Sequence, residues 1–200
     1  MKAILLLSGG LDSTTTLYYA IGKGYQCHAL IFDYGQKHRK EIRYAVAAAK
    51  RVSVAYRVVQ IKLPWKGSSL LDPRHKKKAK GIPPTYVPAR NTIFLSFALS
   101  YAEAIGAEAI FYGANAIDYS GYPDCRPEFV RAFQNLIKAG ARDCGIKVSA
   151  PLIKKTKAQI VQLAKKLGVP IDKTWSCYEG SAKPCGVCDS CKLREKGLKG

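Results

Sequence analysis

A short glycine-rich loop near the N-terminus combines the residue types that bind an anion. An apolar run leads directly into Ser8-Gly9-Gly10-Leu11-Asp12-Ser13-Thr14. Gly9 and Gly10 can adopt the positive φ angles that turn successive N–H groups toward one point, and they lack a Cβ that would keep a ligand away. Ser8 and Ser13 add hydroxyl donors, and the N-terminus of a following helix adds partial positive charge. The segment therefore predicts a phosphate site.

Asp12 distinguishes this loop from a Walker A loop, because the segment contains no lysine and lacks the G-x-x-x-x-G-K-[ST] spacing. A carboxylate beside phosphates is expected where it holds Mg²⁺, which prefers one or two carboxylates together with phosphate oxygens. An ordinary strand-to-helix turn with Asp12 as the helix N-cap is the alternative. We predict a nucleotide site formed by Ser8, Gly9, Gly10, Leu11, Asp12, Ser13 and Thr14.

Four cysteines near the C-terminus have the spacing of metal ligands. Cys177, Cys185, Cys188 and Cys191 form a C-x7-C-x2-C-x2-C pattern. Zinc binds four thiolates tetrahedrally, which leaves no open position for a substrate, so we expect a structural Zn²⁺ site. An iron–sulfur cluster is the alternative, although nothing else in the chain indicates redox chemistry. The odd total of seven cysteines favours a reducing compartment over disulfides and predicts a cytoplasmic protein.

Strand and helix patterns alternate along the chain and must position these residues. Strands are expected at residues 2–7, 27–32, 56–61, 109–112 and 147–150, and helices at residues 12–21, 40–50, 91–105, 128–139 and 157–167. This alternation predicts an α/β fold with a doubly wound parallel sheet. Ligands of such sheets bind at the carboxyl ends of the strands. We expect one catalytic domain over residues 1–171 and a small zinc-bound extension over residues 172–200.

Two connections are expected to surround the ligand. Residues 64–84 show no regular period, which predicts a mobile lid or, alternatively, a solvated excursion. The loop after the fourth strand, residues 112–126, gathers carboxylates, tyrosines, a serine and an arginine. Aromatic faces and a carboxylate can hold a flat guanine-like ring, although a tyrosine-rich surface loop would have the same composition.

Together these motifs resemble a known family. The 8–13 loop resembles the PP-loop of the ATP pyrophosphatase superfamily, whose members cleave ATP between the α and β phosphates to adenylate a substrate. Over essentially its whole length the chain resembles the QueC family, the 7-cyano-7-deazaguanine synthases. The resemblance rests on the 8–13 loop, Asp33-Tyr34-Gly35-Gln36 with His38 and Glu41, Tyr86 to Asn91, Asn115 to Arg126, Pro151-Leu152-Ile153 with Thr156-Lys157, and the four cysteines. Lys37 departs from the pattern, because we expect an arginine there.

The resemblance implies an ATP-dependent ligase of queuosine or archaeosine precursor synthesis. Such an enzyme converts 7-carboxy-7-deazaguanine and ammonia to 7-cyano-7-deazaguanine through adenylated intermediates. It implies a fold like that of the adenine nucleotide α-hydrolases, ATP and Mg²⁺ as cofactors, and a homodimer. The absence of a Cys/His/Glu glutaminase arrangement favours free ammonia as the nitrogen donor.

Roles follow from the geometry that adenylation requires. We expect Asp12, Ser13, Lys157 and Arg90 to be catalytic, with Lys157 neutralising phosphate oxygens unless it is an ordinary solvated lysine. The end of the second strand, Ile31 and Phe32, is expected to meet adenine. Arg90 or Arg126 is the candidate for the substrate carboxylate, and Asp118 or Asp124 for the ring edge. The predicted substrate-binding residues are Tyr86, Arg90, Asn91, Asp118, Ser120, Tyr122, Asp124 and Arg126.

The charge balance leaves a rival function open. The chain carries a formal charge of +19, which is typical of contact with a polyanion, but the basic residues are spread along the sequence. A PP-loop enzyme that adenylates or thiolates a tRNA base is therefore the alternative, and a zinc-stabilised nucleic-acid-binding protein is a further one. We expect that nucleic acid is not required. No segment has the length of a membrane span or the form of a signal peptide.

Overall fold

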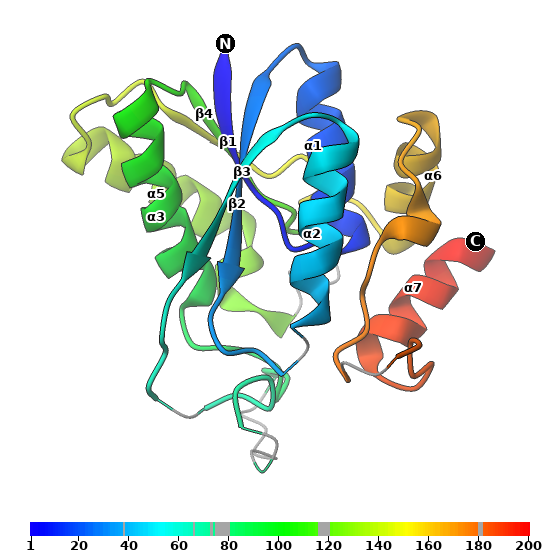
Figure 1. Ribbon diagram of the computed structural model, residues 1–200. Coiled ribbons are helices and arrows are strands. Elements are labelled where there is room, and N and C mark those ends of the chain that lie inside the picture. The colour runs from blue at the N-terminus through cyan, green and yellow to red at the C-terminus, as the bar shows by residue number, and fades with distance from the viewer. Residues whose placement is uncertain (38, 66, 73, 75–80, 116–120, 180–181) are drawn as a thin grey trace.

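A five-stranded parallel sheet forms the centre of the protein (Figure 1). The computed structural model describes residues 1–37, 39–65, 67–72, 74, 81–115, 121–179 and 182–200. The strand order is β3-β2-β1-β4-β5, and every neighbouring pair is parallel. The strands are β1 (Lys2–Leu6), β2 (Gln26–Asp33), β3 (Ala55–Gln60), β4 (Ala109–Phe111) and β5 (Lys147–Ser149).

Helices cover both faces of the sheet. They are α1 (Leu11–Gly22), α2 (Lys40–Arg51), α3 (Arg90–Ile105), α5 (Pro127–Gly140), α6 (Lys157–Lys166) and α7 (Asp189–Lys199), with short 3-10 turns at η1 (Pro123–Cys125) and η2 (Ile171–Lys173). In Figure 1, α1 and α2 lie on one side of the sheet, and α3 and α5 lie on the other. The doubly wound fold predicted from the sequence is confirmed.

The core consists of a layer on each face because successive side chains of a strand point in opposite directions. Along β1, Ala3 and Leu5 pack against α1 and α2, whereas Ile4 packs against α3. Nearly every residue of β2 is buried, as expected for an inner strand of a parallel sheet. The two layers fix the strands firmly, so the loops at their carboxyl ends have a rigid base.

The order of the strands reverses between β1 and β4. The first connections run from β1 toward β3, and the chain then crosses over to β4 on the opposite side of β1. Loops that leave β1 and β4 therefore separate, and the crevice between them is where doubly wound sheets bind ligands. Gly113, just after β4, lies so close to α1 that a Cβ there would be 3.0 Å from the nitrogen of Ser13.

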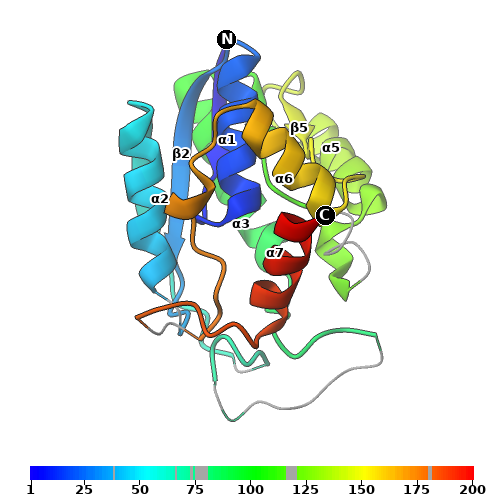
Figure 2. The ribbon, with the colours of Figure 1, turned by 90° about the vertical axis from the view of Figure 1, so that its right-hand side faces the viewer.

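The C-terminal extension packs against the body of the protein instead of standing apart from it. Figure 2 shows α7 beside the N-terminal end of α6. A Cβ on Gly197 of α7 would lie 2.5 Å from Cγ of Lys157, the first residue of α6, so the two helices touch there. Trp175 packs against Tyr44 of α2, with ring centroids 5.4 Å apart. The boundary between a catalytic domain and an extension, placed between residues 171 and 172, stays a prediction.

Most elements agree with the sequence expectations to within one residue at each end. The exception is α7, which the sequence analysis did not predict because the polar and cysteine-rich stretch has a weak helical pattern. The proposed lid lies partly outside the described residues, at positions 66, 73 and 75–80. Among the described residues, no helix combines the length and apolar character of a membrane span.

His28 on β2 is expected to make stability depend on pH. Neither of its ring nitrogens has a hydrogen-bond partner among the described residues, and the Tyr101 ring stands edge-on to it. Burial, together with the charges of Lys2 and Arg57, lowers the pKa of His28 below its ordinary 6.5. Between the folded-state pKa and the ordinary value of 6.5, the unfolded chain binds more protons than the folded one. Neutral His28 therefore contributes stability that is fully present above pH 6.5 and is lost as the pH falls through the folded-state pKa.

Replacement of His28 by phenylalanine should flatten this dependence. We expect the drop in melting temperature between pH 7.5 and pH 5 to be smaller in His28→Phe than in the wild type, measured by thermal unfolding in matched buffers. Identical drops in the two proteins would contradict the assignment.

Candidate nucleotide and substrate site

A cavity of about 230 Å³ lies at the carboxyl ends of β1, β2 and β4. Its wall includes the 8–13 loop, the end of β2, the start of α3, the residues after β4, Lys157 of α6, and part of the C-terminal extension. The topology thus brings together segments that are far apart in the sequence. This is the place where the doubly wound fold predicts ligand binding.

The predicted phosphate loop is held in a single conformation by its own polar groups. Gly9 adopts a φ of 78°, and a Cβ there would lie 2.4 Å from the nitrogen of Ala45, so only glycine fits. Gly10 instead has a φ of −76° and is the N-cap of α1, so only one of the two glycines uses the left-handed region. The hydroxyls of Ser8 and Ser13 lie 3.0 Å apart, and that of Ser13 donates to the carbonyl of Gly10.

Thr14 does not belong to the surface of this loop. It is 1 % exposed, and its hydroxyl has no hydrogen-bond partner among the described residues. Leu11, by contrast, lies in the cavity wall although it is also buried. The loop residues that line the cavity are therefore Ser8, Gly10, Leu11, Asp12 and Ser13, and Thr14 is not among them.

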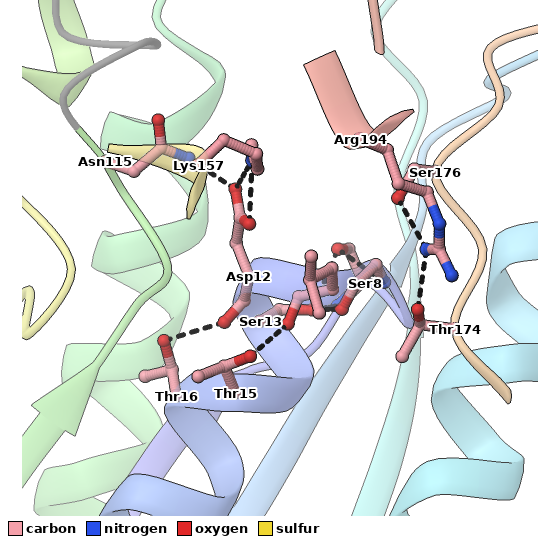
Figure 3. Close-up of polar contacts among 12 residues, drawn as sticks. Ser8, Asp12, Ser13, Thr15, Thr16, Asn115, Lys157, Thr174, Ser176 and Arg194 are labelled. Carbon is pink, nitrogen blue, oxygen red and sulfur yellow. Dashed lines mark hydrogen bonds and ion pairs between the residues drawn. The ribbon is translucent and has the colours of Figure 1, made fainter. Parts of the chain in front are cut away.

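A carboxylate, an ammonium and an amide meet at the mouth of this loop (Figure 3). Both carboxylate oxygens of Asp12 accept from Nζ of Lys157, at 2.8 and 2.6 Å. Asn115, which is fully buried after β4, also donates its Nδ2 to Asp12. The side chain of Asp12 therefore points across the cavity toward α6 and is not the N-cap of α1.

The local sequence explains why Lys157 lies there. Thr156 caps α6, since its hydroxyl accepts from the nitrogen of Gln159 and the Gln159 side chain accepts in return from the nitrogen of Thr156. Lys157 is therefore the first residue of the helix. Its side chain is only 15 % exposed, so it is not an ordinary solvated lysine.

The end of β2 provides an apolar wall. Ile31 and Phe32 line the cavity, as predicted for an adenine-binding edge. The ring of Phe32 stacks on Phe94 of α3 with centroids 3.9 Å apart and planes 5° from parallel. This pair forms a flat apolar surface beside the polar loop.

Arg90 places a fixed positive charge at the opposite side of the cavity. Its Nη1 donates to the hydroxyl of Tyr34 at 3.1 Å. Although burial disfavours the cation, the neighbouring Tyr34 and Asp124 raise the pKa of Arg90 above its ordinary value. Burial raises the pKa of Tyr34 to about 12, so this phenol stays protonated. The pair presents a permanent cation to any anionic ligand.

The other predicted substrate residues separate into groups. Asn91 lies in the wall of the main cavity with Arg90. Tyr86, Tyr122 and Asp124 line a smaller adjoining cavity of about 70 Å³. Arg126 is exposed and lines neither cavity. Asp118 and Ser120 lie outside the described residues.

Asp124 has a structural contact as well. Its carboxylate accepts from the backbone nitrogen of Asn91 at 3.1 Å and thereby caps the start of α3. Burial raises the pKa of Asp124 above its ordinary value, and the bond from Asn91 and the charge of Arg90 oppose that rise. The carboxylate thus helps to set the direction in which Arg90 leaves the helix.

The sequence analysis missed several residues that line the main cavity. One is Tyr112, which is 3 % exposed and whose hydroxyl has no partner among the described residues. A further group belongs to the extension: Trp175, Ser176, Tyr178, Ser190, Leu193 and Arg194. Ser190, Leu193, Arg194 and Gly197 follow the i, i+3, i+4, i+7 spacing of one helix face, which is the signal that could have identified them.

The four cysteines of the extension are brought together as the spacing predicted. The Sγ atoms of Cys177, Cys185, Cys188 and Cys191 all lie within 4.8 Å of one another, and no disulfide joins them. A tetrahedral metal with bonds of about 2.3 Å requires sulfurs about 3.8 Å apart, so the cluster suits a metal ion.

The surroundings of the sulfurs also fit a metal. Backbone N–H groups of Glu179 and Cys185 donate to the sulfur of Cys177 at 3.4 Å. N–H groups of Cys188 and Val187 lower the pKa of Cys185 to about 7. Burial raises the pKa of Cys191 to about 12, so a thiolate at that position needs a cation beside it.

Comparison with known proteins gives one consistent family. The model of the family described as "Queuosine biosynthesis protein QueC" matches residues 2–200. A 7-cyano-7-deazaguanine synthase from Nostoc punctiforme is 52% identical over 97% of this chain and 93% of its own length. One from Thermoplasma acidophilum is 50% identical over 98% of this chain and 87% of its own length.

Solved structures share the fold at low sequence identity. An NMN synthetase from Francisella tularensis superimposes with a TM-score of 0.56 and 17% identity, over 92% of this chain and 70% of that chain. A protein described as a predicted subunit of tRNA methyltransferase from Methanocaldococcus jannaschii gives a TM-score of 0.50 and 16% identity, over 88% of this chain and 92% of that chain. These two likenesses support the fold alone.

Loss of one cysteine should remove the metal before it affects the sheet. In Cys188→Ser we expect the bound metal to fall well below one ion per chain by elemental analysis, and the melting temperature to drop by several degrees. Cys144→Ser is the matched control, because Cys144 is exposed and lies outside the cluster. A Cys188→Ser protein that keeps stoichiometric metal and wild-type stability would contradict a four-cysteine site.

Proposed function

Because the chain belongs to the QueC family of queuosine biosynthesis proteins, we propose that it converts 7-carboxy-7-deazaguanine and ammonia to 7-cyano-7-deazaguanine with ATP. The observation that carries the proposal is a single cavity with a phosphate loop at one side and a fixed guanidinium at the other. In this arrangement ATP would lie at the phosphate loop and the substrate carboxylate would lie near the guanidinium, facing the α-phosphate.

The reaction needs two activations of the same carbon. A carboxylate oxygen attacks the α-phosphorus, the bond to the β-phosphate breaks, and pyrophosphate leaves. Ammonia then attacks the carbonyl carbon, AMP leaves, and a proton is released, which gives the amide. A second ATP then adenylates the amide oxygen and releases pyrophosphate, and loss of AMP and of both protons of the amide nitrogen gives the nitrile. Each step requires in-line positioning and stabilisation of developing negative charge.

We assign the phosphate side to the 8–13 loop and its neighbours. Ser8, Gly10 and Ser13 would hold the pyrophosphate portion through hydroxyl and N–H donors. Asp12 would hold Mg²⁺, which would supply positive charge to the phosphate oxygens. The ion pair of Asp12 with Lys157 supports this assignment, because it keeps both side chains at the site. With a metal bound to Asp12, Lys157 would be available to bind the phosphates.

We assign the substrate side to the start of α3. Arg90 is favoured over Arg126 for the substrate carboxylate, since only Arg90 lines the main cavity. We assign Ile31 and Phe32 to adenine. We assign the deazaguanine ring to Asn91 and to the smaller cavity that Tyr86 and Tyr122 line. Asp118 and Asp124 remain our candidates for its edge, with Ser120 beside them.

We further propose Zn²⁺ as the metal of the four cysteines, because a set of four thiolates is its usual structural ligation. The homodimer and the cytoplasmic location stay predictions. The tRNA-modifying alternative draws its support from the formal charge of +19.

Product analysis tests the proposal directly. The protein is incubated with ATP, Mg²⁺, ammonia and 7-carboxy-7-deazaguanine without RNA, and the products are measured by mass spectrometry. We expect the nitrile and two AMP per nitrile. AMP that forms only after tRNA is added, with no small-molecule product, would favour the tRNA-modifying alternative instead.

Replacement of Asp12 by asparagine should abolish turnover without unfolding the protein. The variant keeps the shape of the side chain but loses the charge that faces Lys157, so we expect the rate of AMP formation to fall by at least about 100-fold. Asp172→Asn is the matched control, because Asp172 is an exposed carboxylate outside the cavity. Near-normal AMP formation in Asp12→Asn would remove Asp12 from the catalytic assignment.

A further inference from the structure

Trp175 joins the extension to the phosphate loop through its backbone. The nitrogen of Trp175 donates to the carbonyl of Gly9 at 2.9 Å, and the carbonyl of Trp175 lies close to Gly10. The segment around Trp175 is therefore anchored to the loop that we assign to the phosphates. Any side chain fixed by the neighbours of Trp175 is held beside that loop.

Arg194 is fixed in this way. Its Nη1 donates to the hydroxyls of Thr174 at 2.7 Å and Ser176 at 3.2 Å, the two residues that flank Trp175 (Figure 3). Its Nη2 donates to the carbonyl of Ile171 at 2.6 Å. Three bonds hold the guanidinium of Arg194 in place, and the residue lines the main cavity.

The charge of Arg194 is not compensated by these bonds. All three acceptors are neutral, and among the described residues no carboxylate forms an ion pair with it. Lys157 differs in this respect, because it forms a direct ion pair with Asp12. Burial lowers the pKa of Arg194, and the charges of Cys191, Asp12 and Asp172 only partly oppose this shift. An anionic ligand in the cavity would compensate the charge of Arg194 further.

The position of α7 makes this arrangement rigid. The helix begins after Cys188, and Cys191 lies within its first turn, so the cysteine cluster holds the start of the helix. Further along, Gly197 rests against Lys157. Arg194 lies between these two fixed points, on the helix face that points to the cavity.

We propose that Arg194, held beside the 8–13 loop, binds the β and γ phosphates of ATP, and hence the pyrophosphate product. The inference rests on the proposed function in taking ATP as the ligand. It assigns a chemical role to the C-terminal extension, which thus completes the nucleotide site in addition to folding around its metal.

Calorimetric titration of the metal-loaded protein with pyrophosphate, ATP and AMP tests the proposal. In Arg194→Gln we expect the dissociation constants for pyrophosphate and ATP to rise about 10- to 100-fold, the usual effect of losing a charge-assisted hydrogen bond. AMP lacks the β and γ phosphates, so its dissociation constant should change less than about 2-fold. Arg194→Lys keeps the charge and should show a smaller loss for pyrophosphate than Arg194→Gln.

Lys196→Gln is the matched control, because it removes one positive charge from an exposed position on the same helix. We expect it to bind all three ligands as the wild type does. Metal content and thermal unfolding are measured for each variant. Equal losses for AMP and ATP in Arg194→Gln, or unchanged pyrophosphate binding, would overturn the proposal and leave Arg194 as a purely structural residue.

The titrations are independent of the product assay. If the wild type binds pyrophosphate and Arg194→Gln does not, the inference stands even when no nitrile is formed, and only the proposed reaction fails. If nitrile is formed and Arg194→Gln binds pyrophosphate normally, the reaction stands and the inference fails.

Discussion

The ion pair between Asp12 and Lys157 is the contact on which the arrangement of the site depends. It joins α1 to α6 across the crevice where the strand order reverses, and Asn115 adds the loop after β4 to the same carboxylate. With side chains only 18 % and 15 % exposed, these opposite charges are held where water screens them little. Three segments that the sheet topology separates are therefore held around one point, and a magnesium–nucleotide ligand would compete for both charges.

A second constraint acts on the substrate side, at the start of α3. Ala89 adopts a left-handed φ of 51°, its nitrogen donates to the hydroxyl of Tyr86, and Asp124 caps the nitrogen of Asn91. These contacts determine where Arg90 leaves the helix. The Tyr86 to Asn91 motif thus sets the direction of the Arg90 guanidinium. Tyr86 and Asn91 position this side chain in addition to lining the two cavities.

The C-terminal extension has two structural roles, which different residues carry. Its thiols gather around a metal position, and its helix α7 lines the cavity and supports Lys157 through Gly197. Lys40 Nζ lies 4.4 Å from the centroid of the Trp175 ring, and Lys37 pairs with Glu179, so the extension is also attached to the region of α2. The cysteine cluster and the cavity are consequently joined by α7, which begins at the cluster and lines the cavity.

The sequence by itself determined the doubly wound fold, the glycine turn of the 8–13 loop, the cysteine cluster and the family, because each depends on local pattern: periodicity, glycine spacing and C-x2-C turns. It could not determine which distant side chains meet. Arg194 is one basic residue in a lysine-rich tail, and Tyr112 is one tyrosine among several, until the fold brings them to the cavity wall. Arg126 and Arg90 are equivalent in the sequence, yet Arg90 is half-buried at the start of α3 and lines the cavity, whereas Arg126 is exposed at the start of α5. Only tertiary packing decides this, since the burial of a side chain arises from contacts between segments.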